Sequence, residues 1–361
     1  MGEREMITPR TFIFNVLNGV ALAIVVGMIP NAILGELSKY LGQYNDIFTK
    51  IAFVTQGIQY SIPILTGILI AAQFGLTQLQ TAVTGAAAFV GSGASTFVDN
   101  KWVIVGIGDL INTMITASIA VGIILLIGNK LGSLNMIVLP IVGGAVAGLL
   151  GLLILPYTKL ITLGLGDVIN GLTNTQPIIM TVLIAMIFSI LIVSPISSIG
   201  IGLAIGISGL AAGSAAVGVS ASAIMLAVGS WRVNKPGVPI TVLLGAVKLM
   251  MPTLIRHPMM MVPIICTAGV SGFVGGLLNI KGTPDSAGFG LIGLVGPIKS
   301  LNLLDMGTTS GLLIIAITYI IVPLISALFF HYLFTKVLNS MILISLNIKF
   351  EPNIKHKLSK R

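Results

Sequence analysis

The chain has 361 residues, of which 55% are hydrophobic and only 8% are charged, and its mean hydropathy is +1.07. An ordinary soluble domain carries roughly 25% charged residues, so this composition excludes a soluble globular enzyme. It predicts an all-α polytopic membrane protein. At about 20 residues for each helical span, plus loops, the chain has room for about eight to ten spans.

The net charge of +9 is concentrated near the C-terminus rather than spread over the chain. Basic residues close after a membrane span favour the cytoplasmic side. We therefore interpret residues 337–361 as a basic cytoplasmic tail, and we expect no nucleic-acid partner. The basic residues from the end of the last expected span onward are Lys336, Lys349, Lys355, Lys357, Lys360 and Arg361.

The apolar runs of the first half are interrupted by polar, small or helix-breaking residues. Residues 47–74 contain Gln56, Gln59 and Pro63, and residues 84–99 have too many small side chains for a lipid-facing span. We expect residues 84–99 to be re-entrant or a tightly buried half-helix. The other spans expected in this half are 12–34, 102–127 and 136–155.

In the second half, the apolar run 199–228 has a middle stretch, residues 208–222, that consists almost entirely of small residues. We predict that this middle stretch is non-spanning or broken and lies in the interior, because small side chains let backbones approach closely. Residues 160–174 are expected at the membrane interface. The other spans expected in this half are 176–193, 238–255, 259–280 and 312–334.

Residues 1–336 are predicted to form a single membrane domain with related halves. Pro30 and Pro156 lie 126 residues apart, and the small-residue runs that begin at Gly85 and Gly209 lie 124 residues apart. Two nearly equal offsets suggest an internal repeat, which is a common device in transporters. The repeat halves would be about 12–135 and 136–255, followed by 256–336.

Residues 281–297, KGTPDSAGFGLIGLVGP, contain five glycines, two prolines and one carboxylate, Asp285. Glycine and proline at this density break a helix and free backbone N–H and C=O groups. The segment is nevertheless too apolar for a water-exposed loop, and irregular backbone at membrane depth persists only where protein buries it or a watery cavity adjoins it. We predict a broken segment at the substrate site; the alternative is a surface loop between two spans.

Ionisable residues within apolar runs are candidates for substrate binding, because a charge at membrane depth is costly. Lys248, Arg256 and His257 follow one another closely in the sequence, and Asp285 is the carboxylate that we expect to face them across a polar cavity. The alternative for Arg256 and His257 is an interfacial position, from which long side chains reach the headgroups.

Four further polar residues are candidates for substrate binding. Asp109 lies in an apolar run, where a lone carboxylate needs a partner or a proton, and Glu36 lies at the end of the first span. Asn31 and Gln176 suit hydroxyl recognition because an amide both donates and accepts. Glu36 is otherwise an interfacial charge, and the amides are otherwise interhelical contacts.

The sequence contains no phosphate-binding loop, no zinc-protease motif and a single cysteine, Cys266. An intrachain disulfide is therefore impossible. We expect no metal, no cofactor and no catalytic residue in this chain.

Several long stretches resemble one known family. They are NGVALAIVVGMIPNAILGEL, TGAAAFVGSGA, VSPISSIGIGLAIGISGLAAGSAAVG, SWRVNKPGVPITVLLGAVKLMMPTLIRHP and KGTPDSAGFGLIGLVGPI. They resemble the second group of phosphotransferase-system EIIC-like membrane proteins, which includes the perfringolysin-regulator type. The resemblance implies membrane passage of a sugar coupled to phosphorylation, in a bacterial plasma membrane. The Gly-Ile-Thr-Glu motif of glucose-type EIIC proteins does not occur in this sequence.

The resemblance favours a translocator of a sugar or another small polar solute as the function. Phosphoryl transfer would require separate EIIA and EIIB carriers, and we expect a homodimer. One alternative is a membrane sensor-regulator that signals through its basic tail. Another is an ion- or proton-coupled carrier of a small anion, for which Lys248, Arg256 and His257 would be suited.

The orientation of the tail is directly testable. A reporter enzyme that is active only in the cytoplasm should be active when fused after Arg361, because the basic residues near the last span hold that end inside. Activity of an exported reporter at the same position would overturn this topology.

Overall fold

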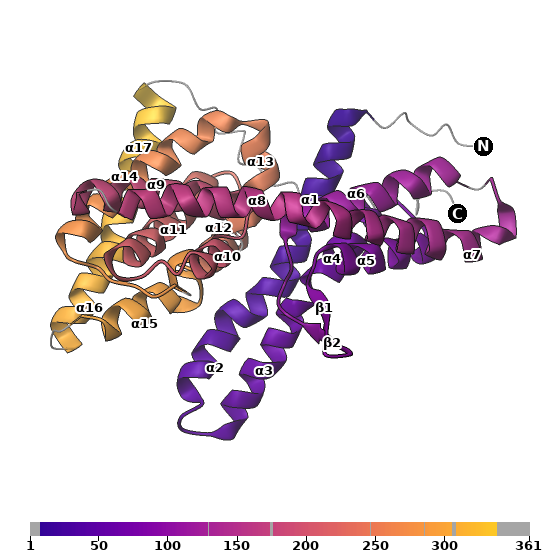
Figure 1. The fold of residues 1–361 in the computed structure, drawn as a ribbon. Coiled ribbons are helices and arrows are strands. Elements are labelled where there is room, and N and C mark those ends of the chain that lie inside the picture. The colour runs from indigo at the N-terminus through magenta and orange to yellow at the C-terminus, as the bar shows by residue number, and fades with distance from the viewer. Residues whose placement is uncertain are drawn as a thin grey trace.

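The computed structural model describes residues 8–128, 130–173, 176–245, 247–284, 286–304 and 308–337. Within these residues almost all regular structure is helical, with one antiparallel β-hairpin. The helices form two groups, and the long helix α8 (Ala147–Thr173) runs from one group to the other (Figure 1). The prediction of an all-α polytopic protein is confirmed.

The first group has its own apolar core, in which α1 packs on α4 and α4 packs on α5 and α6. Val20, Ile24, Ile62, Ile70 and Val121 are buried in this core. The elements of the group are α1 (Pro9–Pro30), α2 (Glu36–Leu41), α3 (Asp46–Tyr60), α4 (Ile62–Gln73), α5 (Gln78–Gly91), β1 (Ser95–Val98), β2 (Lys101–Ile104), α6 (Leu110–Ile127) and α7 (Asn135–Val138).

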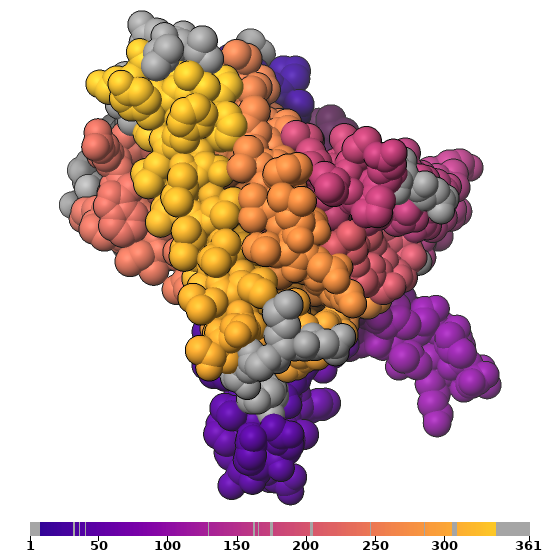
Figure 2. Space-filling model, turned by 90° about the vertical axis from the view of Figure 1, so that its left-hand side faces the viewer, coloured from indigo at the N-terminus to yellow at the C-terminus, as the bar shows by residue number. Residues whose placement is uncertain are grey.

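Two hairpins project from the rest of the molecule. Helices α2 and α3 extend together from the lower side in Figures 1 and 2, and β1 and β2 project beside them. The β-hairpin turns at Asp99 and Asn100, which both have positive φ, and Phe97 packs edge-on against Trp102 with ring centroids 5.5 Å apart.

The second group is built around α11 (Gly209–Ser230), which packs against α9, α14 and α17. Nearly every residue of α11 is buried, so the helix has no lipid-facing side. The other elements of this group are α9 (Pro177–Val193), α10 (Ser198–Ala204), α12 (Gly237–Leu244), α13 (Met251–Arg256), α14 (Met261–Leu277), α15 (Val295–Asn302), α16 (Thr308–Ala316) and α17 (Val322–Tyr332).

Among the described residues, six helices are long and apolar enough to cross a membrane. A bent pair, α3 and α4, meets at 45° and would make seven. This count is below the expected eight to ten, partly because α9 has only 17 residues. The six are Pro9–Lys39, Leu110–Ile127, Gly132–Thr173, Gly209–Ser230, Pro258–Leu277 and Thr309–Lys336.

The predicted break at 208–222 is wrong, although its predicted interior position is confirmed. The stretch is part of the continuous helix α11. A Cβ at Gly213 would overlap the carbonyl of Ile280, and one at Gly218 would overlap the carbonyl of Ala185. The small residues therefore serve close helix packing rather than chain breakage.

Three other expected segments have different boundaries in the structure. Residues 84–99 divide into the end of α5 and the first strand of the β-hairpin, and of the expected segment 160–174 residues 160–173 continue α8 instead of forming a separate interfacial segment. Residues 238–255 are not one span, because α12 ends at Leu244 and a 3₁₀ turn, Val247–Met250, separates it from α13.

Because the carbonyl of Ile280 lies so close to Gly213, we predict that one added methyl group there measurably lowers the stability of the protein. Gly213→Ala should lower stability by about 1–3 kcal/mol, because overpacking forces the neighbouring backbone to move. Thermal unfolding of the purified protein in detergent would measure the change.

Gly57 is the matched control, since nothing lies within 4 Å of a Cβ placed there on α3. Gly57→Ala should be neutral or stabilising by up to about 1 kcal/mol, the difference in helix propensity. Equal unfolding temperatures for the wild type and Gly213→Ala would show that the α11 contact is loose.

Candidate functional site

The segment between α14 and α15 is irregular and buried, as the glycine and proline pattern predicts. It contains two 3₁₀ turns, Ser286–Gly288 and Ile292–Leu294, and positive φ at Gly290 and Leu294. Residues 286–290 are all buried, although they belong to no long helix. The segment is therefore a broken stretch enclosed by protein.

Specific hydrogen bonds satisfy the backbone of this broken stretch. Gly209 and Gly282 exchange backbone hydrogen bonds of 3.0 and 2.9 Å, which join the stretch to the start of α11. The Ser286 hydroxyl accepts from the Thr283 amide and donates to the Thr283 carbonyl, both at 2.9 Å. The Ser300 hydroxyl donates to the carbonyl of Lys281 at 2.7 Å.

A second irregular stretch, residues 194–208, joins α9 to α11 and includes the short helix α10. Ser198 on α10 donates its hydroxyl hydrogen to the carbonyl of Gly288 at 3.0 Å. A Cβ at Gly288 would overlap the backbone of Ile199. The two irregular stretches therefore touch backbone to backbone, in the interior of the second group.

Lys248 reaches this contact from the 3₁₀ turn between α12 and α13. Its ammonium group donates to the carbonyls of Ser194 and of Ile196, the latter at 2.8 Å, and the side chain is only 4% exposed. These carbonyls follow the C-terminus of α9, where the helix dipole favours a cation. Lys248 thus satisfies otherwise unpaired carbonyls and places a positive charge beside the irregular stretches.

A closed pocket of about 20 Å³ lies where the two helix groups meet. Ile24, Met28 and Leu110 line it from the first group, and Lys248 and Phe289 are among the residues that line it from the second. Ser197, Ser198, Gly245 and Gly288 complete its polar and glycine lining. Its volume is about that needed for one water molecule, so the two groups are closed on each other here.

A larger cavity of about 290 Å³ adjoins the closed pocket, since Leu110 and Ser197 line both. Asp109 and Lys159 bring charges of opposite sign to its wall. The Asp109 carboxylate accepts from the backbone N–H of Asn112 at 2.8 Å and so caps the N-terminus of α6. We refer to the closed pocket and this side cavity together as the junction.

The structure separates the basic residues that the sequence grouped together. Lys248 lines the closed pocket, whereas Arg256 and His257 are exposed and belong to the lining of neither cavity of the junction. The Arg256 guanidinium carbon lies 4.1 Å from the centroid of the Phe14 ring, which is a cation–π contact. Asp285 lies outside the described residues, so its expected contact with the basic residues stays a prediction.

The remaining candidates lie in different surroundings. Asn31 is buried, donates to Gln59 at 2.6 Å and accepts from Thr55 at 3.2 Å, so its amide joins α1 to α3. Gln176 is exposed immediately before α9. Glu36 begins α2, and its side chain lies outside what the structure describes. Asp109 is the predicted carboxylate that lines the junction.

Sequence reasoning missed Ser197 and Ser198 and the pairing of the two irregular stretches. A signal for that pairing is present in the sequence. Residues 195–203 read PISSIGIGL and residues 284–291 read PDSAGFGL, which share proline, serine and a Gly-x-Gly-Leu ending in the same order. The Gly-x-Gly part alone is a weak signal of irregular backbone, because a similar Gly-Leu-Gly at 164–166 lies inside α8.

No group of histidine, cysteine or acidic side chains that could hold a metal ion occurs in the part of the chain that the structure describes. The junction thus presents hydroxyls, backbone groups, one carboxylate and two amines. Such a lining is suited to binding a polar solute through hydrogen bonds.

Comparison with known proteins identifies the family of the chain. The family model described as "Phosphotransferase system, EIIC" matches residues 14–342 of the chain. This range includes both helix groups and the whole junction. No curated protein matches the chain.

The contacts of Lys248 predict a structural as well as an electrostatic role. Lys248→Met should lower the free energy of unfolding by about 2–5 kcal/mol, since each buried acceptor left unsatisfied costs about 1–3 kcal/mol. Thermal unfolding in detergent would detect this loss. Lys159→Met is the control, because Lys159 is exposed on α8, and it should unfold as the wild type does. A Lys248→Met protein as stable as the wild type would contradict the carbonyl-capping role.

Proposed function

The chain belongs to the EIIC family of the phosphotransferase system, and on this premise we propose that it carries a sugar-type solute across the membrane at the junction. As a member of this family it is a permease-type component and a multi-pass membrane protein. The proposal adds the solute class and the place where the solute binds.

The observation that carries this proposal is the contact of the broken stretch, buried at residues 286–290, with the partly buried stretch 194–208, beside a cavity shared by both helix groups. Broken segments of this kind hold the substrate in many transporters. A sugar needs both donors and acceptors around its ring. Along the side cavity, Asp109 offers an acceptor, and the Ser197 hydroxyl and the Lys159 amine offer donors.

The dimensions of the junction support a small solute. The side cavity, at about 290 Å³, is close to the lower limit of about 300 Å³ for small-molecule sites. The closed pocket next to it holds no more than a water molecule. We propose that the solute occupies the side cavity and passes onward when the two helix groups move apart.

Coupling to phosphorylation would depend on a separate EIIB protein that meets the cytoplasmic side. Cys266, the single cysteine, lies inside α14 and is partly buried. A phosphoryl carrier must reach both its donor and the solute, and a cysteine within a packed helix is poorly placed for this. The proposed setting is a bacterial plasma membrane, with a homodimer as the expected assembly.

Ligand-dependent thermal stabilisation tests the solute class, since a bound ligand stabilises the folded state. The purified protein should unfold at a higher temperature with one or more sugars of a monosaccharide and disaccharide panel. Organic anions of similar size should have no effect. Stabilisation by anions alone would favour the anion carrier and overturn the sugar proposal.

A variant of Asp109 tests the location of the site. Asp109→Asn keeps a side chain that can cap α6 but removes the negative charge from the cavity wall. We expect the stabilising sugar to bind about tenfold more weakly or worse, because a hydrogen bond to a charged group is worth about 1.5–3 kcal/mol.

Asp46→Asn is the matched control, since Asp46 is an exposed carboxylate in the first turn of α3. It should leave binding unchanged. Sugar binding that is unaffected by Asp109→Asn, or weakened equally by both variants, would place the site elsewhere.

A further inference from the structure

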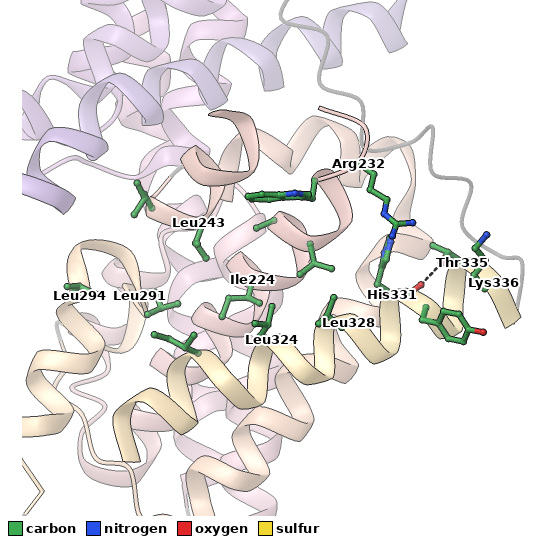
Figure 3. Close-up of a pocket in the computed structure, with 16 residues that line it drawn as sticks. Ile224, Arg232, Leu243, Leu291, Leu294, Leu324, Leu328, His331, Thr335 and Lys336 are labelled. Atoms are coloured by element: carbon green, nitrogen blue, oxygen red, sulfur yellow. Dashed lines mark hydrogen bonds between the residues drawn. The ribbon is translucent and has the colours of Figure 1, made fainter. Parts of the chain in front are cut away.

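A groove of about 800 Å³ lies between α11, α12 and α17, away from the junction (Figure 3). Most of its wall is apolar, and leucines of α17 face residues of α11, α12 and the broken stretch across it. The apolar lining comprises Ile224, Ala227, Val228, Leu243, Leu244, Leu291, Leu294, Ile320, Leu324 and Leu328.

One end of this groove is basic and aromatic. Arg232, His331 and Lys336 converge there, and Figure 3 shows the Arg232 guanidinium beside the His331 ring. No acidic side chain occurs among the described residues that line the groove. Basic groups gathered without a carboxylate among them favour an anion at this end.

The polar end has the features of a membrane–water interface. Trp231 and Tyr332, the chain neighbours of Arg232 and His331, also line the groove and are 56% and 62% exposed, and such aromatic side chains concentrate at the level of the lipid headgroups. Lys336 is the last residue of the candidate span Thr309–Lys336. The orientation predicted from the basic tail puts this end at the cytoplasmic leaflet, where anionic lipids are common.

The length of the groove matches one leaflet of a bilayer. Its apolar floor on the last span extends from Ile320 to Leu328, about 12 Å at 1.5 Å per helical residue. Half of a hydrocarbon core of about 30 Å is about 15 Å. The groove therefore runs from the headgroup level most of the way to the membrane centre.

We propose that this groove binds one anionic phospholipid. The phosphate lies between Arg232 and Lys336, and an acyl chain lies along the apolar faces of α12 and α17. A second copy of the chain that presented the same face would fit the basic end less well, because none of the described residues that line the groove carries a carboxylate. The proposal does not depend on the solute carried at the junction.

Native mass spectrometry of the purified full chain with dioleoylphosphatidylglycerol or dioleoylphosphatidylcholine tests the proposal. One phosphatidylglycerol should remain bound under conditions that remove phosphatidylcholine. Arg232→Gln and Lys336→Gln should each weaken retention about fivefold, the factor that corresponds to about 1 kcal/mol for one basic residue near an anionic surface. Lys235→Gln is the control, since Lys235 is an exposed neighbour that does not line the groove.

A second pair of variants tests the acyl-chain position. Leu328→Trp fills the apolar part of the groove and should abolish retention of phosphatidylglycerol. Ile325→Trp should not, because Ile325 is 62% exposed on α17 and lies outside the groove lining. These variants keep the test valid even if removal of a basic residue were to affect folding.

Four results would overturn the proposal. The first is equal retention of the two lipids by the wild type, and the second is an equal loss in Lys235→Gln and Arg232→Gln. The third is a change from dimer to monomer in Leu328→Trp without loss of lipid, which would assign the groove to a second copy of the chain. Competition by inorganic phosphate alone at millimolar concentration would likewise show an anion site and not a lipid site.

Discussion

The need to satisfy broken backbone away from water governs the centre of this protein. Two stretches leave helical geometry, and where they meet in the interior their N–H and C=O groups are shielded from bulk solvent. The exchange of hydrogen bonds between Gly209 and Gly282, the Ser198 hydroxyl on Gly288 and the Lys248 ammonium on two carbonyls meet this need. Each unsatisfied group in such surroundings would cost several kcal/mol.

The same centre shows why small residues are required there. Backbones that lie in direct contact leave no volume for a Cβ, as at Gly213 and Gly288. Small side chains also let α11 pack closely on α9 and α14, because a helix rich in glycine, alanine and serine can be enclosed on every side. The polar solute site that we propose thus lies on a framework held together by main-chain contacts.

The sequence was sufficient to predict the class of fold and the location of one broken stretch. The charge and hydropathy of the chain exclude a soluble protein, and the glycine and proline content of residues 281–297 indicates buried irregular backbone. It was not sufficient to distinguish a broken α11 from a continuous one. Small residues favour both states, and the choice depends on the neighbours Ala185 and Ile280, which are distant in sequence.

The candidate site was only partly predictable for a similar reason. Lys248 and Asp109 were identified because a charge in an apolar run is rare. Arg256 and His257 satisfied the same criterion, but α13 ends there and leaves both exposed. Ser197 and Ser198 have no charge to mark them, and the role of Ser198 depends on a contact with Gly288, 90 residues away in the chain.

Helix α8 links the relative positions of the two helix groups to the wall of the side cavity. It has 27 residues, about 40 Å at 1.5 Å per residue, and it joins the two helix groups while Lys159 and Leu163 line the side cavity from its middle. A tilt of about 5° around its first turn would displace its far end by about 3–4 Å over that length. Lys159 and Leu163 lie about 18 and 24 Å along the helix from its first residue, so the same tilt would move this part of the cavity wall by about 2 Å.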